Sequence, residues 1–124
     1  MEIAIIAHDG KKAEMVQFLM DHKTLFKQKN ISLVATGTTG SKAKKAGFNV
    51  TPLLSGPLGG DAQIAARVAE GKTKMVIFFR DPLAKHPHEP DISMLMRLCD
   101  VHNVPLATNP ATAEMLVDCY LTKK

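Results

Sequence analysis

The 124-residue chain is 45% hydrophobic and 23% charged, so it can bury the core of one domain without disulfides or a structural metal. Its apolar runs are far shorter than the roughly 18–20 residues of a membrane-spanning helix, which argues against a membrane protein. The net charge is +4, but the lysines are dispersed and aromatic residues make up only 5% of the chain, so small anions are better expected partners than nucleic acid.

The first half of the chain alternates strand and helix patterns. The apolar run Glu2–Ala7 predicts a strand, and apolar residues at three- and four-residue spacing from Met15 to Phe26 predict a helix. Ile31–Thr36 predicts a second buried strand, Lys42–Ala46 a short helix, and Val50–Leu54 a third, weaker strand.

The second half continues the alternation. Asp61–Glu70 has the spacing of a helix that stops at Gly71, and Met75–Phe79 is the most apolar of the predicted strands. The segment Asp81–Pro90 contains three prolines and predicts a stiff loop.

The last predicted elements are a helix, a strand and a helix. An apolar stripe within residues 92–99 predicts the first of these helices, and Pro105–Thr108 predicts a fifth strand. Asn109 is a favourable N-cap for the final helix, because Pro110 then occupies its first position.

This order of elements predicts the fold class. Strands that are apolar on both faces and alternate with helices indicate a parallel sheet covered by helices on both sides. We therefore expect a single doubly wound α/β/α domain, residues 1–124, with a five-stranded parallel sheet. In such folds the ligand binds beyond the carboxyl ends of the strands, and polar residues follow nearly every predicted strand here.

The segment TGTTGS, residues 36–41, is the first candidate binding feature. Its glycines allow backbone N–H groups to turn toward a ligand, and the helix that follows adds the positive end of its dipole. With the threonine hydroxyls these groups can hold a phosphate, and Lys12 can add a full positive charge. A tight strand-to-helix turn with a threonine cap explains the pattern equally well.

Asp61 follows the segment SGPLGG at the start of a predicted helix. An Asp at such a position is commonly an N-cap. The alternative is a general base directed at the ligand, with Gly59 and Gly60 allowing the substrate to approach the backbone. The sequence alone does not separate these interpretations.

The segment HPHEPD contains His86, His88, Glu89 and Asp91. Two histidines and a carboxylate can bind zinc, but no further Cys or His completes a convincing ligand set, so we expect no metal. We favour a pair in which Asp91 orients the imidazole of His88, while His86 points elsewhere and has no assigned contact. The alternative is an exposed loop histidine beside a helix-capping Asp91.

Five segments together resemble the methylglyoxal synthase family: IAHDGKK, ATGTTG, LSGPLGGDAQI, FFRDPLAKHPHEPD and VPLATNPATAE. They occur in the family's order and extend from the first predicted strand to the last predicted helix. The combination of SGPxGGD with DPLxxxPHxPD is highly specific. Regulatory domains of the same fold, such as the allosteric domain of carbamoyl-phosphate synthetase, share the threonine-rich loop but lack this pair of motifs.

The resemblance implies a carbon–oxygen lyase that converts dihydroxyacetone phosphate into methylglyoxal and inorganic phosphate. It implies that Asp61 is the catalytic base and His88 the electrophilic partner, with Asp9, Asp81 and Asp91 as supporting carboxylates. The residues that it implies in substrate and phosphate binding are His8, Lys12, Thr36, Gly37, Thr38, Thr39, Ser55, Gly56 and His88.

The resemblance also implies that no metal or other cofactor is needed and that the protein is a homo-oligomer, typically a hexamer. Inorganic phosphate is expected to inhibit, because the same loop would hold it. The alternative function is a non-catalytic regulatory domain that senses a phosphorylated ligand.

We expect a cytoplasmic protein for two reasons. Residues 1–7 are strand-like and unlike a signal peptide. Cys99 and Cys119, both expected on buried helix faces, suggest a reducing compartment.

Overall fold

The computed structural model, in which residues 1–122 are described, is built on a sheet of five parallel strands in the order β3-β2-β1-β4-β5. The strands are β1 (Glu2–Ala7), β2 (Ser32–Thr36), β3 (Val50–Leu53), β4 (Thr73–Phe79) and β5 (Leu106–Ala107). In the centre of the sheet, Ile5 of β1 pairs with Ala35 of β2 and with Ile77 of β4. The predicted five-stranded parallel sheet is confirmed.

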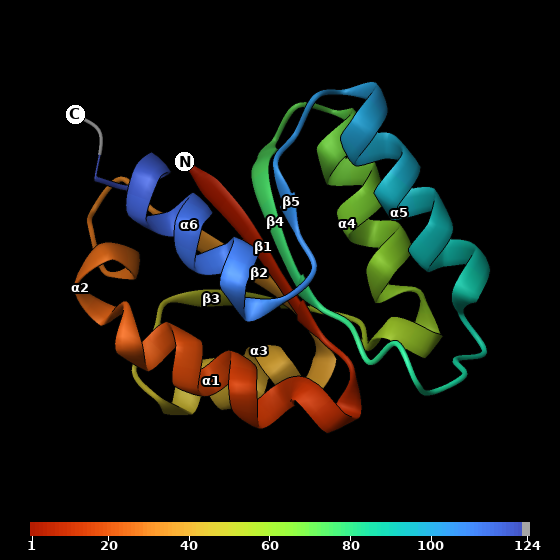
Figure 1. The fold of residues 1–124 in the computed structure, drawn as a ribbon, viewed down its shortest axis with the longest axis horizontal. Coiled ribbons are helices and arrows are strands. Elements are labelled where there is room, and N and C mark those ends of the chain that lie inside the picture. Colours follow the sequence, from red (N-terminus) through yellow and green to blue (C-terminus); the bar gives the residue numbers. More distant parts are fainter. Residues whose placement is uncertain (123–124) are drawn as a thin grey trace.

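Helices cover both faces of this sheet (Figure 1). They are α1 (Lys12–Asp21), α2 (Lys23–Phe26), α3 (Gly37–Lys45), α4 (Gly60–Ala69), α5 (Glu89–Val101) and α6 (Pro110–Tyr120), with short 3-10 helices η1 (Asp9–Lys11) and η2 (Gly56–Leu58). Helices α1, α2, α3 and α6 lie on one face and α4 and α5 on the other. The molecule therefore has the three α/β/α layers that the sequence predicts.

Successive residues of the central strands point alternately into two separate hydrophobic cores. Ile5 and Ile77 face the core under α1, α3 and α6, whereas the next residues, Ile6 and Phe78, face the core under α4 and α5. This alternation explains why the central strands are apolar without interruption. The chain runs from β1 outward through β2 to β3 and then crosses to β4 on the other side of β1, so the order of strands reverses between β1 and β4.

The glycine–threonine segment differs from its prediction. It was expected as a loop before a helix at Lys42, but α3 begins at Gly37, directly after β2. Gly37 has a φ of +35°, and a Cβ added there would lie 2.8 Å from the Cα of Ser55. Glycine and threonine have low helix propensity, so the pattern suggested a loop, but the close approach to the segment after β3 favours the helix.

Two smaller expectations also change. The helix predicted from Met15 to Phe26 is divided at His22 into α1 and α2, although Phe26 stays buried. Cys99 is buried as expected, but Cys119 is exposed, because it lies on the opposite side of α6 from the buried Val117. No helix formed by residues 1–122 has both the length and the hydropathy needed to cross a membrane.

Candidate active site

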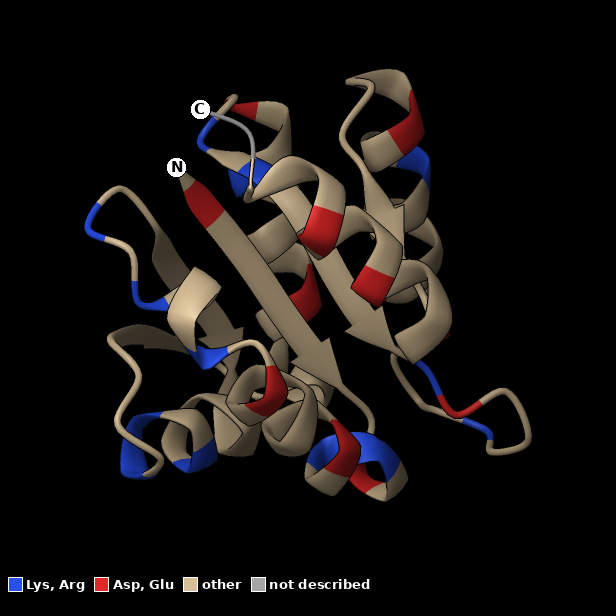
Figure 2. Ribbon diagram, turned by 60° about the vertical axis from the view of Figure 1, so that its left-hand side comes forward, with Lys and Arg blue, Asp and Glu red and all other residues tan. Residues whose placement is uncertain are grey.

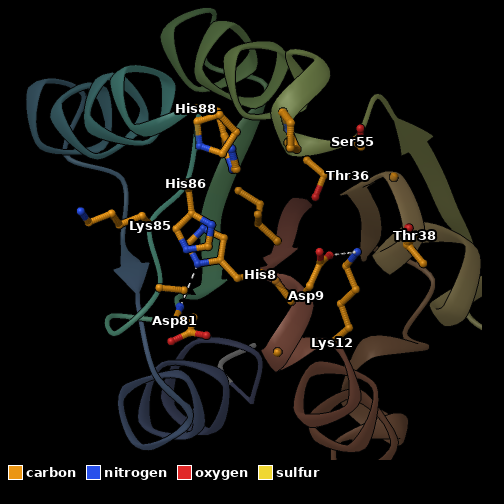
Figure 3. A pocket seen from close by; sticks show the side chains of 18 residues that line it. His8, Asp9, Lys12, Thr36, Thr38, Ser55, Asp81, Lys85, His86 and His88 are labelled. Atoms are coloured by element: carbon orange, nitrogen blue, oxygen red, sulfur yellow. Dashed lines mark hydrogen bonds and ion pairs between the residues drawn. The ribbon is translucent and has the colours of Figure 1, made fainter.

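A cavity of about 510 Å³ opens at the carboxyl ends of the strands, where their order reverses (Figure 3). Most of the predicted site residues line it: His8, Asp9, Lys12, Thr36, Gly37, Thr38, Ser55, Gly56, Asp81 and His88. Three others do not: Thr39, Asp61 and Asp91. Segments far apart in the sequence are thus brought to one edge of the sheet, as expected.

The positively charged side of the cavity is formed by the starts of α1 and α3. Lys12 Nζ lies 2.7 Å from the Asp9 Oδ1 atom, and this ion pair lowers the pKa of the exposed Asp9. Thr36 and Thr38 flank the start of α3, whose first-turn N–H groups have no acceptor within the helix. Figure 2 shows Lys and Arg scattered over several helices and loops, so the positive charge at this side of the cavity is local and comes from Lys12. Lys85 borders the cavity, but its amino group points away from it (Figure 3).

Thr39 lies deeper than predicted. It is fully buried, and its hydroxyl has no hydrogen-bond partner among residues 1–122. Successive residues of a helix point about 100° apart, so Thr39 faces inward while its neighbour Thr38 is exposed at the cavity.

His8 is a buried, neutral hydrogen-bond donor. Its Nδ1 accepts the backbone N–H of Asp81 at 2.8 Å, so in the neutral ring Nε2 carries the proton. Burial, followed by the nearby imidazoles of His86 and His88, lowers the pKa of His8 to about 4. The ring is therefore uncharged near pH 7 and offers an N–H group that has no partner within residues 1–122.

Asp81 acts through its backbone as well as its carboxylate. Its N–H group fixes His8, while its Oδ1 accepts the N–H of Leu83 at 3.1 Å and closes the turn after β4. The supporting carboxylate implied by the family resemblance is thus a turn-forming group in this structure.

Asp61 and His88 face each other behind Gly56. Asp61 is fully buried, both of its carboxylate oxygens lack a hydrogen-bond partner in the described part of the chain, and its Oδ2 lies 3.6 Å from His88 Nε2. A Cβ added to Gly56 would lie 2.9 Å from His88 Nε2 and 3.4 Å from Asp61 Oδ1. The missing side chain of Gly56 therefore leaves the carboxylate and the imidazole within reach of the cavity.

The capping interpretation of Asp61 is wrong. Helix α4 begins at Gly60 after Gly59, and no side chain caps it. Gly60 packs so closely that an added Cβ would lie 2.0 Å from the Leu54 carbonyl oxygen. This contact anchors the first turn of α4 against the segment after β3, and Asp61 follows within that buried turn. Burial raises the pKa of the Asp61 carboxyl, His88 lowers it, and the charge of Asp91 raises it.

The predicted pairing of Asp91 with His88 is absent. Within residues 1–122 no side-chain hydrogen bond joins them, and His88 Nδ1 has no partner. They are joined through the backbone instead, because the Asp91 N–H donates to the His88 carbonyl at 3.0 Å as α5 begins. Asp91 does not cap α5 either, and its charge acts on Asp61.

Two cavity residues with polar side chains were not predicted as site residues, Lys85 and His86. His86 was expected to have no contact, but its ring stacks on His8 with centroids 3.6 Å apart. The spacing HxH after one strand was the available signal, since it places both histidines in the loop that follows β4 at the switch in strand order.

The three imidazoles fit a metal ion poorly, although ligand nitrogens of His8, His86 and His88 lie within 4.8 Å of one another. A metal needs nitrogen lone pairs that converge on one point about 2.0–2.1 Å away. The Nδ1 lone pair of His8 is occupied by Asp81, so its Nε2 carries a proton and no free lone pair. The planes of His8 and His86 are inclined by only 20°, which points their lone pairs side by side.

Comparison with known proteins agrees with this geometry. The family model of the MGS-like domain matches residues 14–108. A methylglyoxal synthase of Thermoanaerobacter sp. (strain X514) is 59% identical over 94% of this chain and 88% of its own length. The chain belongs to the methylglyoxal synthase family. The predicted family is thereby confirmed.

Other methylglyoxal synthase relatives are similar over nearly the whole chain. That of Moorella thermoacetica is 55% identical over 94% of this chain and 91% of its own length. The crystal structure of methylglyoxal synthase from Elizabethkingia anophelis NUHP1 is 37% identical and superposes with a TM-score of 0.88, covering 99% of this chain and 80% of that one. The methylglyoxal synthase fold thus includes every element that forms the cavity.

Proposed function

We propose that this protein is a methylglyoxal synthase that converts dihydroxyacetone phosphate into methylglyoxal and inorganic phosphate. The observation that carries the proposal is the buried, unpartnered Asp61 carboxylate 3.6 Å from His88, reached over Gly56. The names of its relatives favour this function over a non-catalytic phosphate-sensing domain, which needs no such pair.

The phosphate group of the substrate would lie at the positive side of the cavity. Lys12, Thr36, Thr38 and the first-turn N–H groups of α3 supply charge and hydrogen bonds, and Ser55 lies on the facing wall. The carbonyl and the hydroxymethyl group would then extend toward Gly56, which brings the reacting carbon to Asp61.

The reaction proceeds in two bond-breaking steps. Asp61 removes a proton from the hydroxymethyl carbon, and the electrons of that C–H bond form an enediolate. His88 and His8 donate hydrogen bonds to its oxygens, and stabilisation of this kind commonly makes one of the largest contributions to catalysis. A proton then moves between the two enediolate oxygens, which leaves the negative charge on the oxygen of the former hydroxymethyl carbon. That oxygen forms a C=O bond, the double bond shifts to the next pair of carbons, and the C–O bond to phosphate breaks with phosphate keeping the bonding pair. The resulting enol gains a proton on its terminal carbon and loses its hydroxyl proton, which gives methylglyoxal. None of these steps requires a metal or a cofactor.

We further propose that residues 1–124 act as one domain in the cytoplasm and assemble into a homo-oligomer, a hexamer by family resemblance. The decisive experiment is to incubate the purified protein with dihydroxyacetone phosphate and to trap the dicarbonyl product with a hydrazine. Methylglyoxal and phosphate should appear in equal amounts. Binding of the substrate without either product would support the regulatory domain instead.

Inorganic phosphate should inhibit in competition with the substrate, because both would occupy the site at α3. The variant Thr38→Val removes a hydroxyl from this site and should weaken phosphate and substrate binding by about three- to ten-fold, since one hydrogen bond contributes about 1 kcal/mol. Inhibition constants and KM values measure this, and Thr51→Val on the exposed part of β3 is the matched control. A rate unchanged by millimolar phosphate would contradict the assigned site.

Asp91 should tune the pH dependence of the reaction through Asp61. Burial raises the pKa of Asp61, and the negative charge of Asp91 raises it as well. The acid limb of kcat/KM, which reports ionisation of the base, should therefore lie above the usual range for Asp. In Asp91→Asn the limb should move to lower pH, because the ionised base is no longer repelled. A limb that stays in place would exclude this coupling.

A further inference from the structure

The stacking of His86 on His8 has no part in the proton transfers assigned above. The ring centroids are 3.6 Å apart and the planes are inclined by 20°. His86 lines the cavity and is half-buried, and its Nε2 is buried without a hydrogen-bond partner among residues 1–122. His86 therefore contacts His8 with the face of its ring (Figure 3).

The other contacts of His8 are a hydrogen bond at Nδ1 and two rings that meet it edge-on. The hydrogen bond from Asp81 holds only Nδ1, and a tilt of the ring about its Cβ–Cγ bond would weaken it. Phe78 contacts the ring at a centroid distance of 5.0 Å with the planes at 75°, and His88 at 5.9 Å with the planes at 79°. Among the rings of the described residues that contact His8, His86 alone is stacked flat on it, and this contact opposes a tilt that would turn the Nε2–H away from the cavity.

The loop after β4 holds the ring of His86 in this position. Pro87 follows His86 directly, and a residue before proline is restricted to extended conformations. The carbonyl of His86 also accepts the N–H of Glu89 at 3.3 Å, where α5 begins. His86 is thus held at both its backbone and its ring.

We propose that His86 is a positioning residue whose ring fixes the orientation in which His8 donates its Nε2–H to the substrate. This inference rests on the proposed function in one respect, the identity of the ligand that accepts the hydrogen bond. The orientation of His8 itself is a property of the protein alone and can be measured without turnover.

The charged and titratable groups around His8 are His86, His88, Arg80, Asp81 and the adjacent Asp9. The first three lower the pKa of His8, and Asp81 raises it, while burial lowers it most. Removing the His86 ring both exposes His8 to water and removes one of the groups that disfavour its protonation. Both changes raise the pKa of His8.

Two substitutions separate the ring of His86 from its nitrogens. His86→Ala removes the ring and should reduce kcat/KM by about ten-fold. Without the ring, the Nε2–H of His8 is no longer held in the orientation in which it donates to the substrate, and the rate depends on that orientation. His86→Phe keeps a flat ring and should stay within about three-fold of the wild type. His102→Ala, at the exposed end of α5, is the matched control.

Nitrogen-15 NMR of the protein without added ligand gives a readout that does not depend on catalysis. His8 should be the Nε2–H tautomer in the wild type and in His86→Phe, whereas His86→Ala should raise its pKa and mix the tautomers. The proposal is overturned if His86→Phe is as impaired as His86→Ala, or if His86→Ala leaves both kcat/KM and His8 unchanged. If even the wild type does not convert the substrate, the proposed function fails, and the NMR comparison still decides the role of His86.

Discussion

Asp61→Asn should reduce kcat by about 10²–10⁴-fold, the range expected when a general base is removed. The asparagine amide has nearly the same shape but cannot accept a proton from carbon. Phosphate binding should be unaffected, because Asp61 does not line the cavity. Steady-state kinetics and phosphate inhibition constants separate the two effects.

The same variant should also fail to exchange the substrate's carbon-bound protons with deuterated solvent. Exchange reports the first proton transfer even when phosphate is not eliminated. Asp100→Asn, an exposed carboxylate on α5, is the matched control and should keep both activities. An Asp61→Asn enzyme with near-normal turnover would remove Asp61 from the mechanism.

Asp61→Asn should at the same time stabilise the protein at neutral pH. Burial raises the pKa of Asp61 in the folded state, so the folded protein holds this proton more tightly than the unfolded chain does. That contribution is complete below the unfolded pKa of about 3.9 and is lost as the pH rises through the raised value. At pH 7 the variant should gain about 1–3 kcal/mol in free energy of unfolding, the cost of a buried unpartnered group, and near pH 4 the gain should vanish. Urea unfolding at the two pH values measures it.

His88→Gln should reduce kcat by about 10²–10³-fold while changing KM little, within the range expected when general acid–base catalysis by an imidazole is lost. Glutamine keeps an N–H donor of similar reach, but it cannot pass protons between oxygens as an imidazole can. The buried position of His88 beside Asp61 makes this loss specific to the transition state.

The control for His88→Gln is His102→Gln, which changes an exposed histidine at the end of α5. This variant should match the wild type in kcat and KM. Treatment with a chelator should also leave the wild-type rate unchanged, because the lone pair of His8 is already engaged by Asp81. Loss of activity on chelation would instead favour a metal site at the three imidazoles.

The sequence was sufficient to predict the sheet and the edge at which the site forms. Continuous apolar runs such as Met75–Phe79 identify buried parallel strands, and Asn109 caps α6 as predicted, with its Oδ1 accepting the Thr112 N–H. The start of α3 at Gly37 was missed, because contact with Ser55 outweighs the local propensity of glycine.

Within the site, prediction failed where a role depends on a contact between distant segments. Whether Asp61 caps its helix or faces His88 depends on where α4 begins, and that start is set by the packing of Gly60 on Leu54. The stacking of His86 on His8 depends on the path of a loop between β4 and α5. No local pattern carries that information.

Because the strand order reverses between β1 and β4, the site residues come from two separate stretches of the chain. Lys12, Thr36, Thr38 and Asp61 all come from the stretch before β4, whereas His86 and His88 come from the single loop after it. An exchange of that one loop would remove His86 and His88 and leave His8, Lys12 and the threonines of α3 in place. Replacement of that loop alone should therefore abolish turnover while phosphate binding remains.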